Sequence, residues 1–360
     1  MRLTNHMRQT IGGTVLGILT VSLMASQYLF GSTTYTPPTV DATPLVTAAD
    51  AEAMETLSEP ADAYEMLRLH FTGSVVIGSM LGTQTHGTFN AAVSENGTKP
   101  WLAHCAKRFA NDAMTFSLLD TVLTDNAALQ TRSKTERVWY MAPTYHAKIL
   151  ENGGIDTVSV ATSHSLDYGT DGLSDTIAAL SEYSIAWGNG ENAVYRTQND
   201  VTIGVYPALV RLTEPAETDE EDAPHVPYDA TVLAWIENAR TKCAWTAVYL
   251  TVDDMYPATD DALIAFAELC ADRGVDLVLL DIDPSGAPVV LEKGNAKICY
   301  GLGAFLSGGE RLTDERHGVL EVAIRTENGA IASWDTEVLT FVSDAAEPWI
   351  LYAPDPFATE

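Results

Sequence analysis

Short apolar runs alternate with amphipathic segments from residue 67 onward. The stretch RLHFTGSVVIGS (68–79) has the composition of a strand followed by a glycine-containing turn. TIAALSEY (176–183) is typical of a helix. In DDALIAFAELCADRG (260–274) apolar residues recur at helical spacing and a glycine ends the run, and VDLVLL (275–280) follows as a buried strand. Helices that alternate with strands predict an α/β domain.

The last part of the chain has a different pattern. GVLEVAIRTENGAIASWDTEVLTFV (318–342) alternates in the manner of strands around Glu-Asn-Gly at 327–329. This pattern predicts a closing β-hairpin. We therefore expect the folded domain to cover residues 65–345 and a C-terminal tail to cover 346–360.

A long run without charged residues lies near the N-terminus. Residues 9–31 contain no Lys, Arg, Asp or Glu, and they are long enough for the roughly 20 apolar residues that cross a bilayer. The basic residues Arg2 and Arg8 precede this run, so the positive-inside tendency places residues 1–8 in the cytoplasm and the rest outside. We predict a single-pass signal anchor in the cell membrane with an extracytoplasmic main domain. A cleavable signal peptide is the alternative, but the apolar run exceeds the usual length.

The segment between the predicted anchor and the first strand is a predicted tether. Residues 32–64 are rich in Thr, Pro, Ala and acidic residues. Such a composition has little apolar surface to bury, and it is typical of extended linkers. The segment would hold the domain away from the membrane.

Charge excludes one class of partner. The 360 residues carry 49 Asp and Glu against 20 Lys and Arg, which gives a formal net charge of -29. A chain this acidic repels polyanions, so we expect no nucleic acid partner. The four cysteines (Cys105, Cys243, Cys270 and Cys299) have no metal-finger spacing and are interpreted as small buried thiols. Export would also permit a disulfide, whose pairing the sequence does not select.

One polar turn carries candidate chemistry. GGIDTVSVATSHSLDYGTDGLSDTIAAL (153–180) has the pattern of a strand, a turn with His164 and Asp167, and a helix. A carboxylate beside a histidine orients the imidazole and stabilises its charged form, which suits general acid–base catalysis. The alternative is structural, with Asp167 accepting backbone N–H bonds at the start of the helix. A serine nucleophile at Ser163 or Ser165 is disfavoured because the chain has no G-x-S-x-G motif.

Six stretches occur in an order that points to a known family. They are FTGSVVIG (71–78), DTVLTDNAAL (120–129), ATSHSLDYG (161–169), VYLTVDD (248–254), VDLVLLDIDPSG (275–286) and CYGLGAFLSGG (299–309). Together they resemble the bacterial capsule synthesis CapA family, also called the poly-γ-glutamate synthesis protein family. The third stretch is the most specific because it keeps the pattern His-x-x-Asp-x-Gly.

The resemblance implies a fold and a process. Members of the family look like calcineurin-type metallophosphoesterases, so we expect an α/β sandwich of two mixed β-sheets flanked by helices, behind the N-terminal transmembrane helix. The implied process is the biosynthesis, export or anchoring of a capsule or poly-γ-glutamate polymer. Besides the membrane, the implied partners are an anionic cell-surface polymer or its synthesis machinery.

Most metal-ligand positions of the family are substituted. By the resemblance, the family's ligands fall on Ser74, Asp125, Ser163, Thr251 and Asp281. A two-metal phosphoesterase needs a bridging carboxylate and several further ligands to hold its ions and activate water, and serine and threonine hydroxyls are weak neutral ligands. We therefore expect no metal cofactor, and we predict a non-catalytic accessory or binding module.

The alternative hypothesis is that the protein is still an enzyme. A diverged metal-dependent phosphoesterase or hydrolase would have a rebuilt site around His164 and Asp167, with Asp125, Asp253 and Asp281 as further ligands for Mn²⁺ or Zn²⁺. A purely structural cell-surface protein is a third class. In each case the positions of the family site should meet at one end of the sheets, because binding sites gather in the loops at strand ends.

Overall fold

The computed structural model describes residues 64–80, 83–126, 139–214, 226–253, 257–283, 286–309, 316–344 and 347–352. They belong to a unit that covers Asp62–Glu360. The predicted transmembrane segment at 9–31 and most of the predicted linker lie outside the described residues. Within the described part of the chain, no helix combines the length and apolar character needed to cross a membrane.

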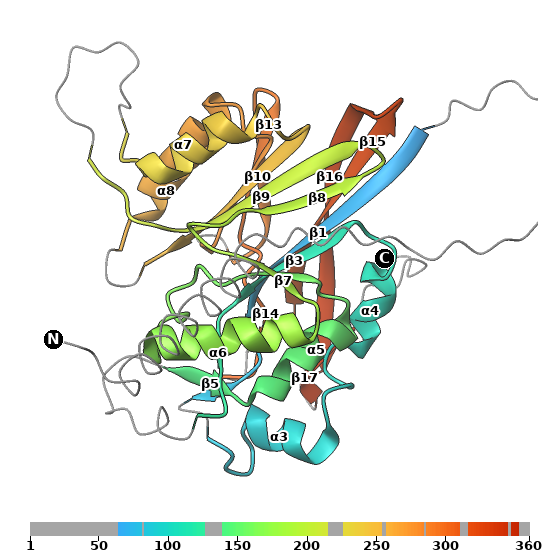
Figure 1. Cartoon of the computed structure of the whole chain (residues 1–360), viewed down its shortest axis with the longest axis vertical. Helices are drawn as coiled ribbons and strands as arrows, with labels where there is room; N and C mark the ends of the chain where they lie inside the picture. Colours follow the sequence, from blue (N-terminus) through green and yellow to red (C-terminus); the bar gives the residue numbers. More distant parts are fainter. Residues whose placement is uncertain are drawn as a thin grey trace, which may run out of the picture. The chain divides into compact units, whose positions relative to one another are not determined.

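Two mixed β-sheets form the centre of this unit (Figure 1). The first sheet has the strand order β17 (Glu347–Tyr352), β16 (Ala330–Asp344), β15 (Arg316–Glu327), β1 (Tyr64–Val76), β3 (Met114–Leu119), β6 (Thr157–Ser159) and β7 (Ala186–Gly188), with β14 (Ala304–Ser307) beside β1. The second has the order β12 (Val289–Lys293), β13 (Ala296–Tyr300), β11 (Leu277–Leu280), β10 (Trp245–Val252), β9 (Val201–Val210) and β8 (Val194–Gln198). A small third sheet joins β2 (Ser79–Met80), β5 (Tyr140–Ala142) and β4 (Val122–Leu123).

Helices pack against the two large sheets on their outer faces. The first sheet is covered by α3 (Phe89–Asn96), α4 (Ala103–Phe109), α5 (Ala147–Gly153) and α6 (Gly169–Glu182), with the short η2 (Thr144–His146) leading into α5. The second is covered by α7 (Ala230–Ala239) and α8 (Asp260–Asp272). The predicted α/β fold with mixed sheets and flanking helices is thereby confirmed.

Apolar clusters hold these layers together. Between the sheets, Phe71 of β1 packs against Trp245 of β10, with ring centroids 6.4 Å apart. On the outer face of the second sheet, α8 buries the apolar residues whose spacing predicted the helix: Leu263, Phe266, Ala267 and Cys270. Thr259 caps the N-terminus of this helix, because its side chain accepts a hydrogen bond from the Ala262 backbone N–H.

The C-terminal hairpin forms as predicted, but the predicted tail does not remain outside the sheet. Strands β15 and β16 meet at Asn328 and Gly329, whose φ angles of 54° and 74° suit a two-residue hairpin turn. Residues 347–352, which we assigned to the tail, form the edge strand β17 on β16. Leu351 of this strand is fully buried, and this burial explains why the segment joins the sheet.

The four cysteines are free thiols in the structure. Cys105, Cys270 and Cys299 are buried, as expected, whereas Cys243 is half-buried. Burial raises the pKa of the Cys105 thiol and of the Cys299 thiol to about 12. Such thiols are poor nucleophiles.

Several loops of the candidate site follow the carboxyl ends of parallel strands. In the first sheet β1, β3 and β6 are parallel, and in the second sheet β10 and β11 are parallel. The residues that follow these strands therefore carry the polar groups of the candidate site.

Candidate functional site

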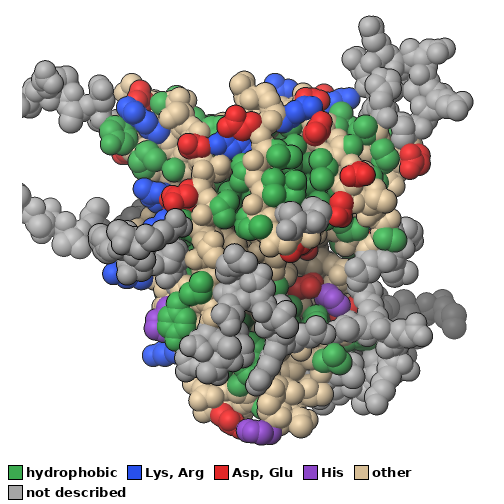
Figure 2. Space-filling view, turned by 180° about the vertical axis from the view of Figure 1, so that it is seen from behind, with side chains coloured by type: hydrophobic (Ala, Val, Ile, Leu, Met, Phe, Trp, Pro, Cys, Tyr) green, Lys and Arg blue, Asp and Glu red, His purple; other side chains and the backbone are tan. Residues whose placement is uncertain are grey.

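Polar side chains from both sheets approach one another at the carboxyl ends of parallel strands. Asp120 follows β3, Asp281 follows β11, and His164 lies in the loop between β6 and α6. The His164 Nε2 atom is 3.9 Å from the Asp120 Oδ2 atom, and the Asp120 charge acts on Asp281. Figure 2 shows acidic and histidine side chains gathered in a hollow near the middle of one face. The candidate site is thus an acidic recess with one histidine.

The His164 ring is fixed by the turn that carries it. Its Nδ1 atom lies 2.7 Å from the Oδ2 atom of Asp167, which is almost fully buried. The ring also packs against Tyr140 of β5, with ring centroids 5.0 Å apart. Because the carboxylate of Asp167 accepts the Nδ1 proton, the Nε2 atom is directed to the Asp120 side. The predicted pairing of His164 with Asp167 is present in the geometry.

Asp281 has an unusual environment. Its backbone N–H continues the parallel ladder by donating to the Leu250 carbonyl at 2.9 Å. The residue is exposed to solvent. Partial desolvation of the carboxyl, followed by the negative charge of Asp120, raises the pKa of Asp281 to about 7. Near neutral pH this group therefore exchanges a proton, as a general acid or base must.

The hydroxyl of Thr251 forms hydrogen bonds within the protein. Thr251 is 2% exposed, and its Oγ1 atom lies within hydrogen-bond reach of the backbone carbonyls of Ala161 and Ala208. Ala161 belongs to the loop after β6 and Ala208 to β9, so this hydroxyl ties the His164 loop to the second sheet.

The turn beside His164 uses its hydroxyls in the same way. The Thr162 Oγ1 and Ser165 Oγ atoms are 2.9 Å apart, and Ser165 Oγ also accepts the Thr162 backbone N–H at 3.2 Å. Ser163, which the resemblance assigned to a ligand position, lies between them in the chain and directly precedes His164. The hydroxyls of Thr162 and Ser165 therefore shape the turn.

Ser74 lies where three segments of the first sheet crowd together. Its backbone N–H donates to the Gly303 carbonyl at 3.1 Å, and the ladder between β1 and β14 shifts register directly after it. The preceding residue must be glycine, because a Cβ atom on Gly73 would lie 1.7 Å from the Gly303 carbonyl oxygen. The backbone at Ser74 thus fixes the 301–304 segment at the edge of the site.

The other acids proposed for a rebuilt site are engaged in local contacts. Asp125 is exposed and accepts hydrogen bonds from the backbone N–H and the hydroxyl of Thr144. Asp253 is buried and forms an ion pair with Arg211, whose Nη2 atom is 2.8 Å from its Oδ2 atom. The structure brings His164, Asp167 and Asp120 together, and the charge of Asp120 acts on Asp281.

Sequence reasoning missed Asp120. It directly follows the fully buried apolar strand β3, just as Asp281 directly follows the buried strand β11. An acidic residue directly after a buried apolar strand can be recognised in the sequence. This criterion would have selected Asp120, and not Asp125, as a candidate site residue. The contact of Tyr140 with His164 has no such signal, because it depends on the packing of a separate small sheet.

A family comparison identifies the chain. The model of the family described as "Bacterial capsule synthesis protein PGA_cap" matches residues 68–309. This chain belongs to the PGA_cap family. The match includes Ser74, Asp120, His164, Thr251 and Asp281, and the prediction of the CapA family is confirmed. None of the curated proteins matches the chain.

Solved structures with a similar arrangement are distant from this PGA_cap protein. One is described as a novel phosphatase from Mycoplasma pneumoniae, with 12% identity, 78% of this chain and 96% of that chain covered, and a TM-score of 0.42. Another is a hypothetical protein from Thermus thermophilus, with 14% identity, 76% and 99% covered, and a TM-score of 0.40.

The donor set that the described residues provide does not fit a two-metal centre. Such a centre needs a bridging carboxylate and several His, Asn or Asp ligands. Among the described residues, no group of three His, Cys, Asp or Glu side chains is placed to hold a metal ion. At Thr251, a position that we expected from the resemblance to correspond to a ligand, the hydroxyl is engaged with backbone carbonyls.

Proposed function

We propose that this PGA_cap protein works in capsule or poly-γ-glutamate biosynthesis, export or anchoring as a non-catalytic accessory or binding module. In this proposal a calcineurin-like sandwich is held outside the cell membrane by the N-terminal segment at 9–31. The observation that carries the proposal is the bonding of Thr251, whose hydroxyl stands at a ligand position and is used to connect the His164 loop to the second sheet.

Net charge indicates what kind of partner the module meets. With a formal charge of -29, the chain repels an anionic polymer over distances of about a Debye length, near 8 Å at physiological salt. Direct binding of a bare polyanion is therefore opposed. We favour a protein of the polymer synthesis machinery as the partner over the polymer itself.

A phosphoester assay tests the non-catalytic proposal. The full-length protein in detergent, incubated with a generic aryl phosphate and Mn²⁺ or Zn²⁺, should give no turnover above that of a His164→Ala variant. The matched control is Thr197→Val, an exposed strand substitution remote from His164 in the chain. Turnover that is lost in His164→Ala and kept in Thr197→Val would refute the proposal.

A second candidate function is favoured by one observation. Asp281, whose pKa is raised to about 7, and the imidazole of His164, which is hydrogen-bonded to Asp167, both lie within reach of the charge of Asp120. This arrangement suits a diverged hydrolase that acts by acid–base catalysis. Such an enzyme would lose activity in both Asp281→Asn and His164→Ala, with a pH profile that bends near 7 in the wild type. A flat profile at background level would exclude it.

A further inference from the structure

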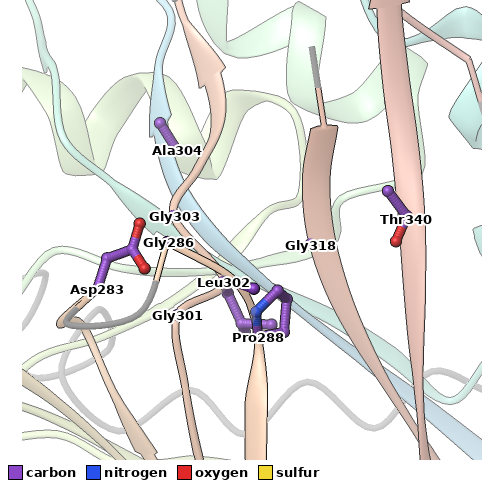
Figure 3. Close-up of a pocket in the computed structure, with 10 residues that line it drawn as sticks. Asp283, Gly286, Pro288, Gly301, Leu302, Gly303, Ala304, Gly318 and Thr340 are labelled. Atoms are coloured by element: carbon purple, nitrogen blue, oxygen red, sulfur yellow. The ribbon is translucent and has the colours of Figure 1, made fainter. Parts of the chain in front are cut away.

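A second recess is lined in part by the 301–304 segment. It is a cavity of about 330 Å³, at the lower end of the roughly 300–1,000 Å³ typical of small-molecule sites. Three groups of residues line it: Asp283 and residues 286–288 after β11, the segment 301–304 between β13 and β14, and the paired residues Gly318 and Thr340 of β15 and β16 (Figure 3).

Glycines keep the cavity open. A Cβ atom on Gly318 would lie 2.9 Å from the Pro288 ring, so only glycine lets that loop pack close to β15. Gly303 has φ of 64°, and a Cβ atom built on it meets nothing within 4 Å. A side chain at Gly303 would therefore stand in the open space of the cavity.

The chemical character of the walls is acidic on one side and apolar on the other. Asp283 is exposed, and its carboxylate has no hydrogen-bond or ion-pair partner among the residues that the structure describes. Figure 3 shows this carboxylate turned to the Gly303 segment, with Pro288 beside Leu302. The described lining contains no Lys, Arg or His. A cation with N–H donors suits these walls, and an anion does not.

We propose that this cavity binds the ammonium end of a small amino-acid-like or peptide molecule. The ammonium group pairs with the Asp283 carboxylate, and the carbon skeleton lies against Pro288 and Leu302. The negative field of the whole chain adds to the attraction for a cation. The proposal does not depend on the role in capsule production, because it concerns a cavity lined by other residues than Asp120, His164 and Asp281.

Calorimetric titration of the full-length protein in detergent tests the proposal. L-alanine amide, which carries an ammonium group and no carboxylate, should bind saturably with one site per chain. N-acetyl-L-alanine amide, which lacks the ammonium group, should not bind. Tri-alanine amide distinguishes the two sources: tighter binding than alanine amide assigns the site to a peptide end, weaker binding assigns it to a free amino compound, and either supports the proposal.

Two variants and two matched controls locate the binding. Asp283→Asn removes the charge, and it should weaken binding at least about tenfold, as expected for the loss of a charged hydrogen bond. Gly303→Asn places a side chain that tolerates positive φ in the cavity and should also weaken binding. Glu292→Gln, on β12, and Gly294→Asn, at a hairpin glycine with φ of 62° and open space, should keep wild-type affinity. Melting temperatures confirm that each variant is folded.

Several results would overturn the proposal. These are equal binding of the acetylated compound, full affinity in both cavity variants, and the lack of saturable binding at millimolar amine. Asp283-dependent binding of Ca²⁺ without binding of the amine would also overturn it. Metal content and phosphoester turnover are independent readouts, so each proposal can fail while the other stands.

Discussion

Replacing Thr251 with valine removes the hydroxyl and keeps nearly the same volume, so the substitution isolates the hydrogen bonds. The hydroxyl of Thr251 donates its hydrogen to the carbonyl of the buried residue Ala161, and the Ala208 carbonyl is a second acceptor at 3.2 Å. Loss of one such bond costs about 1 kcal/mol, and a buried carbonyl left without a partner adds about as much again. We expect Thr251→Val to lower the free energy of unfolding by about 2 kcal/mol, equivalent to about 4 °C in melting temperature.

Urea unfolding of the full-length protein in a nonionic detergent, followed by tryptophan fluorescence, measures this difference. The matched control is Thr197→Val on the exposed strand β8, whose effect should stay within about 0.5 kcal/mol because its hydroxyl contact is exposed. If Thr251→Val is no less stable than this control, the Thr251 hydroxyl is not a structural connection. It would then be available to a ligand, and the argument against a metal-ligand role at this position would fail.

Two further outcomes are expected. Desolvation and the charge of Asp120 raise the folded-state pKa of Asp281 from 3.8 to about 7. Between pH 4 and pH 7 the folded protein therefore holds a proton on Asp281 that the unfolded chain releases. The free energy of unfolding consequently falls as the pH rises from about 4 to 7. Asp281→Asn removes this loss: its melting temperature should exceed that of the wild type at pH 8 by more than at pH 4, and a pH-independent difference would contradict the assignment. For topology, protease added to intact spheroplasts should digest residues 67–360, and protection equal to that of a cytoplasmic control protein would show that the domain is not outside.

Elements with a strong local period could be predicted from the sequence. The helix over 260–274 and the hairpin over 318–342 depend on spacing and on turn residues that act within a few positions. β17 could not be predicted in this way, because it forms by pairing with β16 and by burying Leu351 against residues distant in the chain. Short edge strands take their register from tertiary contacts.

The candidate site could be predicted only in part, because some of its contacts also join residues that are distant in the chain. His164 and Asp167 lie three residues apart in one turn, so their pairing follows from local structure. The order of the family stretches could not fix which acid after β3 faces the site, and the structure selects Asp120 five residues before Asp125. The role of Thr251 depends on a carbonyl in the loop after β6, distant in sequence, which no local pattern reveals.

The metal content of the purified protein tests the central claim most directly. Full-length protein, dialysed extensively against metal-free buffer, is analysed for Mn, Zn and Fe by mass spectrometry, beside a His164→Ala variant prepared in the same way. Because Thr251 offers an engaged hydroxyl where the family would have a ligand, the account predicts well below one metal ion per chain, with no difference between the two proteins. One or two tightly held ions per wild-type chain, lost in His164→Ala, would contradict the account and establish a metal centre at this site.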